Sequence, residues 1–133
     1  MNSIRQPAVA GMFYPGNVVE LRRTVEDFLA AVPDHDGAAP KAIVAPHAGY
    51  IYSGPIAATA YARIRALRDT VTRVVLLGPA HRVPFRGLAL PGADGLATPL
   101  GVVPIDKDAV AAISPLPQVT ELPAAYEGEH SLE

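Results

Sequence analysis

Two histidines follow short apolar segments of the chain, a position that suits residues that carry out chemistry. His47 comes just after residues 42–45, and His81 comes just after residues 73–78. A neutral imidazole is a good ligand for iron, zinc or copper, but two imidazoles make an incomplete site that needs one more group. The spacing alone is as consistent with two hydrogen-bonded loop residues as with a metal or catalytic site.

A third histidine, His130, lies in the polar segment 127–131. It could be a further ligand or a proton shuttle, because an imidazole pKa near ~6.5 suits acid–base chemistry. Its position in the sequence favours the simpler interpretation, a flexible C-terminal tail. His35 lies in the polar loop 33–40, where we expect it to be solvated.

Hydroxyl-bearing side chains come soon after His47. Tyr50, Tyr52 and Ser53 could line a pocket for an aromatic or phenolic ligand and donate hydrogen bonds to it. The tyrosines are equally consistent with packing residues that keep an exposed hydroxyl. Arg82, next to His81 in the sequence, could add a cation for an anionic ligand.

The elements predicted around these residues form an α/β fold. Residues 42–45 are apolar without alternation, which suits a strand covered on both faces, and residues 73–78 are the strongest strand signal in the chain. A helix is expected over residues 54–67, with Ser53 as its N-cap and Pro55 in its first turn. Strand, helix and strand in this order predict a βαβ unit with parallel strands. Both histidines would then meet at the carboxyl edge of the sheet, where such sheets bind ligands.

The flanking segments also carry helix and turn signals. Residues 1–16 predict an extended arm, and a helix is expected over 18–32 because Asn17 and Glu20 fit a capping box. The other elements expected are a strand at 87–90, a loop or irregular hairpin at 91–105, and a short helix capped by Asp106 that ends at Ile113. From residue 114 onward the pattern fades into Pro, Glu and Gly. These elements together predict a mostly parallel sheet flanked by helices.

The composition excludes several classes of protein. The chain has 133 residues, of which 50% are hydrophobic and 18% charged, and this excludes wholesale disorder. The net charge of −2 is not basic enough for a general nucleic-acid or anionic-membrane surface. The chain contains no cysteine, so these residues form no disulfide and no thiolate metal site. Its apolar runs are short of the ~20 residues of a membrane helix, and we expect a soluble, cytoplasmic protein.

Several motifs in one order resemble the Memo family, whose prokaryotic members are also called AmmeMemoRadiSam system protein B. The resemblance covers essentially the whole chain, and the motif order makes it much more specific than any one motif. The segments that carry it are residues 5–15, 46–54, 77–81, 98–101 and 129–133.

The resemblance implies a fold similar to class III extradiol dioxygenases, with 1–133 as a single domain that is the N-terminal portion of a longer family domain. It implies that His47 and His81 occupy metal-site positions, with a remaining ligand outside this chain. The metal implied is divalent, possibly Fe(II), with copper or zinc as alternatives. His130 would be a catalytic base near this site, and Tyr50 could also move protons.

Two functions follow as alternatives. One is a metal-dependent, dioxygenase-like oxidoreductase that acts on a small aromatic molecule. The other is a non-enzymatic protein that binds a peptide, phenolic or phosphate ligand through Tyr52, Ser53 and Arg82, or Arg86. The resemblance also implies companions of the AMMECR type and of the radical SAM type, and an exposed sheet edge predicts self-association.

Overall fold

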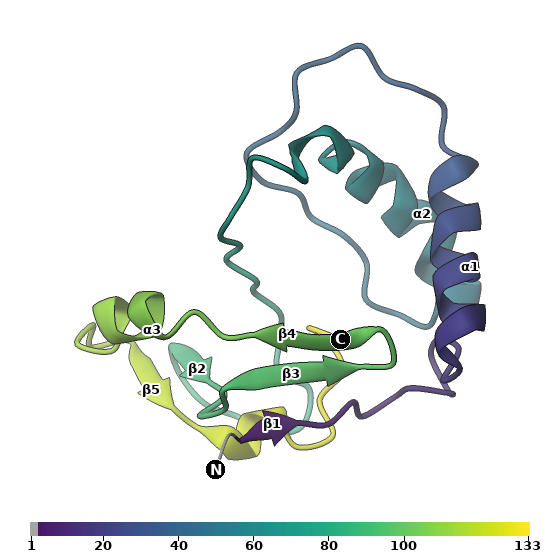
Figure 1. The fold of residues 1–133 in the computed structure, drawn as a ribbon. Helices are drawn as coiled ribbons and strands as arrows, with labels where there is room; N and C mark the ends of the chain where they lie inside the picture. Colours follow the sequence, from purple (N-terminus) through teal and green to yellow (C-terminus); the bar gives the residue numbers. More distant parts are fainter. Residues whose placement is uncertain (1–2) are drawn as a thin grey trace. The chain divides into compact units, whose positions relative to one another are not determined.

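The chain divides into two compact units in a computed structural model that describes residues 3–133. One unit, Ala10–Val75, contains the two longer helices and is called the helical unit. The other contains the N-terminal arm as far as Val9 together with Leu76–Glu133, and is called the strand unit because it contains the named strands. Figure 1 labels the elements of each unit.

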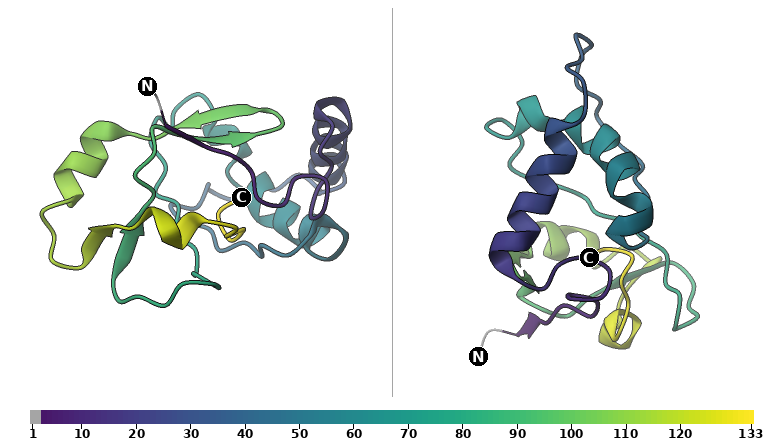
Figure 2. Two further views of the ribbon diagram at one scale, coloured as in Figure 1. Left: turned by 90° about the horizontal axis from the view of Figure 1, so that it is seen from below. Right: turned by 90° about the vertical axis from the view of Figure 1, so that its right-hand side faces the viewer.

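Helix α1 (Val18–Ala30) confirms the helix predicted after Asn17. The Asn17 side chain accepts hydrogen bonds from the N–H groups of Val19 and Glu20, at 2.9 and 3.1 Å, and so caps the helix start. Leu21 is the residue of this helix that is buried, with 3% of its surface exposed. Helix α1 packs beside helix α2 (Tyr50–Ala62), as both views in Figure 2 show.

Helix α2 begins at Tyr50, four residues before the predicted start at residue 54, and Gly49 rather than Ser53 is its N-cap. Ser53 lies inside the helix, where its hydroxyl donates to the Ala48 carbonyl at 2.6 Å. Pro55 therefore lies beyond the first turn, and its missing N–H removes only the bond that residue 51 would accept. The helix ends at Ala62, and a short 3₁₀ helix, η1 (Arg65–Leu67), follows within the predicted range.

The close approach of the two helices requires a glycine. A Cβ atom added at Gly54 would collide with the ring of Phe28 on α1. Gly54 is buried, so the absence of a side chain there allows the two helix backbones to come together.

The prediction of strands at residues 42–45 and 73–78 was wrong, because neither segment is a strand in the structure. A strand exists only when its N–H and C=O groups pair with a neighbour, and apolar side chains alone do not supply that neighbour. Val44 and Val75 are 96% and 81% exposed. The predicted βαβ unit is therefore not formed within the described residues 3–133.

The strand unit has two small sheets, and its parallel pairs together with the helices confirm the α/β class. In one sheet, β1 (Ile4–Arg5) pairs in parallel with β3 (Gly95–Thr98), which forms an antiparallel hairpin with β4 (Gly101–Pro104). In the other, β2 (Leu88–Leu90) pairs in parallel with β5 (Val119–Glu121). The sequence predicted the hairpin and β2.

Two helical segments complete the strand unit. Helix α3 (Lys107–Ile113) confirms the predicted short helix, since the Asp106 side chain accepts from the Ala109 N–H at 2.9 Å. The 3₁₀ helix η2 (Pro123–Tyr126) follows β5 and leads into residues 127–133. Neither β5 nor η2 was predicted, because both are short and lie in the Pro- and Gly-containing region where the apolar pattern fades.

Candidate metal centre

The carboxylate of Glu129 holds His81 at two points. Its Oε2 atom accepts the main-chain N–H of His81 at 2.6 Å, and its Oε1 atom lies 2.8 Å from the ring Nδ1 of the same residue. The Glu129 side chain is 7% exposed, whereas the His81 side chain is 42% exposed. A buried carboxylate thus holds an imidazole whose ring is accessible to solvent.

The main chain around Glu129 keeps this carboxylate ionised. Burial by itself would raise the pKa of Glu129, but hydrogen bonds from the main chain and ring of His81 and from the N–H groups of Ser131 and His130 lower it to about 2. The last two N–H groups both donate to Oε1, at 2.9 and 2.8 Å. The pair of His81 and Glu129 therefore carries a negative charge at neutral pH when the imidazole is neutral.

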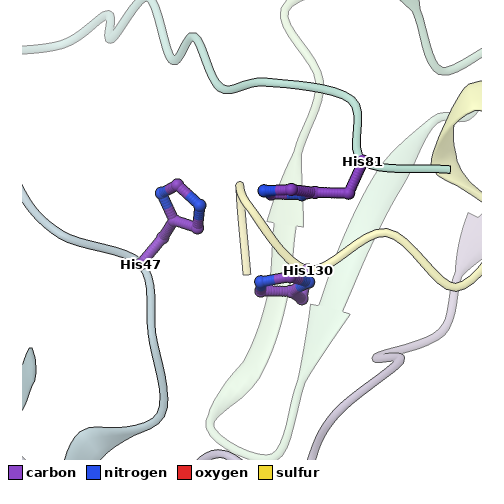
Figure 3. A group of neighbouring side chains, drawn as sticks. All are labelled: His47, His81 and His130. Atoms are coloured by element: carbon purple, nitrogen blue, oxygen red, sulfur yellow. The ribbon is translucent and has the colours of Figure 1, made fainter. Parts of the chain in front are cut away.

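His130 stacks on His81. The ring centroids are 4.7 Å apart and the ring planes are 13° from parallel. Possible ligand atoms of the two imidazoles lie within 4.8 Å of each other, and Figure 3 shows the two rings one above the other. The His130 N–H donates to Glu129 and the neighbouring Ser131 hydroxyl donates to the Pro79 carbonyl, so His130 does not belong to the flexible tail that its sequence position favoured.

His47 belongs to the helical unit, on the segment that leads from residues 42–45 into α2. Figure 3 draws it together with His81 and His130. In the strand unit, His81 and His130 are histidines whose ring nitrogens could contribute to a metal site. His35 has a local role, because its Nδ1 atom accepts the Gly37 N–H at 2.7 Å.

Residues 129–133 form further hydrogen bonds around the histidine pair. Ser131 donates through its hydroxyl to the Pro79 carbonyl at 2.7 Å, two residues before His81. Glu133 accepts the N–H groups of Ala8 and Val9 at 2.7 and 2.9 Å, and so holds the N-terminal arm. The C-terminal motif is thereby fixed on both sides of His130.

Arg5 supports the same segment from the arm. Its guanidinium donates to the main-chain carbonyls of Tyr126, at 3.1 Å, and of Glu129. It also lies 3.6 Å from the Glu133 carboxylate, in a pair whose side chains are 15% and 2% exposed. Arg5 therefore connects strand β1 to the main-chain segment that carries His130, the candidate metal ligand.

Two of the predicted site residues have packing contacts in the helical unit. The Tyr50 ring lies 5.6 Å from that of Tyr14 and 6.1 Å from that of Phe28, between centroids. Burial, followed by the nearby Tyr61, raises the pKa of Tyr50, so its phenol stays protonated at neutral pH and can donate a hydrogen bond. Ser53 is 5% exposed, and its hydroxyl is bonded to the Ala48 carbonyl.

The remaining predicted residues are on the surface. Tyr52 is 80% exposed in the helical unit. Arg82 and Arg86 are exposed in the strand unit, and the guanidinium of Arg82 lies close to Gly128, since a Cβ atom added there would be 3.3 Å from its Nη1. Arg82 is therefore a cation near the main chain that precedes Glu129.

The functional roles of Glu129, Arg5 and Glu133 were not predicted from the sequence. Their roles depend on hydrogen bonds between residues that are far apart, such as Ala8 with Glu133, which are separated by 125 positions. The available signal was the placement of Glu129 beside His130, because histidine ligands commonly pair with a carboxylate. Among the described residues, no helix is both long and apolar enough to cross a membrane.

Residues 5–133 match the model of the protein family described as Memo-like protein. The chain is 41% identical over 130 residues to a MEMO1 family protein from Aquifex aeolicus, covering 98% of this chain and 47% of that protein. It is 38% identical over 146 residues to one from Methanocaldococcus jannaschii, covering 100% of this chain and 50% of the relative. The chain thus spans about half the length of these curated relatives.

Proposed function

Because this chain belongs to the Memo-like protein family, we propose that it provides a histidine-based divalent-metal centre for an oxidoreductase of the dioxygenase type. The observation that carries the proposal is the proximity of the ring nitrogens of His81 and His130, within 4.8 Å, beside the buried carboxylate of Glu129. The donor chemistry fits, because imidazoles favour Fe(II), Zn²⁺ and copper over Mg²⁺ or Ca²⁺.

In this proposal, His81 and His130 supply imidazole donors from the strand unit. His47 would supply a further imidazole, as the resemblance to the family implies. A bound divalent ion would supply Lewis-acid chemistry and, if it is iron or copper, redox chemistry. Arg82 would attract an anionic group of the substrate, since its guanidinium is exposed. Tyr50, which the sequence predicts as a site residue, would donate a hydrogen bond to the substrate, because its raised pKa keeps the phenol protonated.

Metal content tests this proposal directly. The chain is purified without oxygen, loaded with Fe(II) or Zn²⁺, and analysed by elemental mass spectrometry. We expect near-stoichiometric metal, and at least a tenfold weaker affinity in the His81→Ala and His130→Ala variants. His35→Ala is the matched control, because this imidazole bonds only locally to Gly37 within the contacts described. If both site variants retain stoichiometric metal, the site assignment is wrong.

Turnover then separates the oxidoreductase from a binding protein. A screen of catechols with Fe(II) and O₂ is expected to yield a ring-cleaved product that depends on His81. The alternative is a protein that binds a phenolic, peptide or phosphate ligand through exposed residues such as Tyr52 or Arg82. A ligand-induced rise in melting temperature without product would favour that alternative.

A further inference from the structure

We propose that Glu129 is a positioning residue that fixes both the orientation and the tautomer of the His81 imidazole. The hydrogen-bonding part of this inference concerns the metal-free chain. Its consequence for metal affinity rests on the function proposed above, in which His81 is a ligand.

The orientation follows from contacts at both ends of the His81 residue. One carboxylate oxygen of Glu129 receives the His81 main-chain N–H at 2.6 Å, and the other lies 2.8 Å from Nδ1 of its ring. A side chain held at its backbone and at its ring by one rigid group loses its rotational freedom about χ1 and χ2. The exposed edge of the ring is therefore presented in one direction.

The carboxylate is itself held in place. Its Oε1 atom also accepts the N–H groups of His130 and Ser131, at 2.8 and 2.9 Å. The main-chain carbonyl of Glu129 receives the guanidinium of Arg5. Because the group is 7% exposed and receives several donors, it cannot turn away from His81 without breaking its hydrogen bonds with the partly buried N–H groups of His81, His130 and Ser131.

The tautomer follows from the chemistry of the partner. An ionised carboxylate only accepts hydrogen bonds, so the Nδ1 atom of His81 must carry the proton that they share. The lone pair then lies on Nε2, which is the nitrogen presented to an ion. The contact is specific to His81, because Nδ1 of His130 lies 3.6 Å from the same oxygen, longer than a hydrogen bond.

The first experiment measures the tautomer without any metal. Long-range ¹H–¹⁵N correlation NMR is recorded on the histidine-labelled, metal-free chain at pH 8, and His81→Gln identifies the resonances. We expect Nδ1 of His81 to be protonated and Nε2 to carry the lone pair. In Glu129→Gln we expect a shift towards the Nε2–H form, whereas Glu127→Gln, an exposed neighbouring carboxylate, leaves the tautomer unchanged.

The second experiment measures metal affinity in the same variants. We expect Glu129→Gln to weaken Zn²⁺ binding by about 10- to 100-fold and Glu127→Gln to have no effect. An Nε2–H tautomer in the unsubstituted chain overturns the inference, and so do unchanged tautomer and affinity in Glu129→Gln. If the tautomer is as expected but the unsubstituted chain binds no metal, the positioning role stands and the proposed function fails. If Glu129→Gln does not fold, as circular dichroism would show, the tautomer of the unsubstituted chain remains decisive.

Discussion

Glu129 shows how a side chain acquires its role from the groups that contact it. The same carboxylate on a surface would have an ordinary pKa and no fixed direction. Here it is buried, it accepts main-chain N–H groups from His81, His130 and Ser131, and it contacts the His81 ring. A residue of this kind contributes to the stability of the fold, in addition to the role at His81 proposed above.

The contribution of Glu129 to folding should make the stability of the chain depend on pH. The pKa of Glu129 is lowered from 4.5 to about 2, because the hydrogen bonds outweigh burial. A carboxyl with a depressed native pKa adds stability that is present above its unfolded pKa and is lost as the pH falls towards its native pKa. The free energy of unfolding of the metal-free chain should therefore fall between about pH 4.5 and 2, as measured with urea. A Glu129→Gln variant should lose this part of the slope, and an unchanged slope would contradict the assignment.

The contacts of Arg5 give a second prediction, which concerns the free energy of unfolding. Its side chain is 15% exposed and bonds to two carbonyls and to the Glu133 carboxylate. We expect Arg5→Met to lower the free energy of unfolding by roughly 2–4 kcal/mol, because buried acceptors lose a charged donor.

The matched control for that prediction is Arg23→Met. Arg23 pairs with Asp27 on α1, but both side chains are more than two-thirds exposed, at 83% and 72%. An exposed pair of this kind contributes under ~0.5 kcal/mol. Urea unfolding of both variants should therefore separate them clearly, and equal losses would show that the Arg5 contacts add little.

The elements of the fold differ in how far the local sequence determines them. Helix α1 was predictable because its N-cap Asn17 and its apolar period both lie within a few residues. Residues 42–45 and 73–78 were predicted wrongly because a strand depends on a partner that no local pattern specifies. The candidate site divides in the same way. His81 could be proposed from its local sequence, and its role as a ligand stays a prediction, whereas the contact of Glu129 with His81 depends on a bond across 48 positions.

The packing of α1 against α2 gives a prediction for Gly54. In an isolated helix, Gly→Ala is favourable by about 1 kcal/mol. Here the added Cβ atom would collide with the Phe28 ring, so we expect Gly54→Ala to destabilise the chain by roughly 1–3 kcal/mol. Thermal or urea unfolding provides the measurement.

A second substitution tests the cause of that loss. Phe28→Leu removes the ring atoms that the added Cβ atom would meet. The Gly54→Ala and Phe28→Leu changes should therefore be strongly non-additive, with the double variant more stable than the sum of the single losses indicates. Additive losses would place the strain elsewhere.

At the scale of the whole molecule, apolar side chains remain on the surface of both units. Val44 is 96% exposed in the helical unit, and Leu77 is 70% exposed in the strand unit. Val74 and Val75 are 75% and 81% exposed, and they lie in the same exposed segment as Leu77. A continuous apolar segment of this kind favours association with another surface.

We therefore expect the chain to self-associate as its concentration rises. Val75→Lys should weaken the association measured by analytical ultracentrifugation, because a charge must then be desolvated, while the unfolding free energy changes by less than ~0.5 kcal/mol. Gln118→Lys adds the same charge at another exposed position and should leave association unchanged. Equal effects of both substitutions would point to net charge instead of the apolar segment.

The bond between Glu133 and the N-terminal arm has a consequence for synthesis on the ribosome. Ala8 is translated 125 positions before the carboxylate that accepts its N–H. At about 5–20 residues per second, the arm waits for roughly 6–25 s before Glu133 is made. The helical unit, whose residues 10–75 are continuous in the sequence, can become compact during that interval. The strand unit, and the histidine pair with it, can be completed only after residues 129–133 have left the exit tunnel.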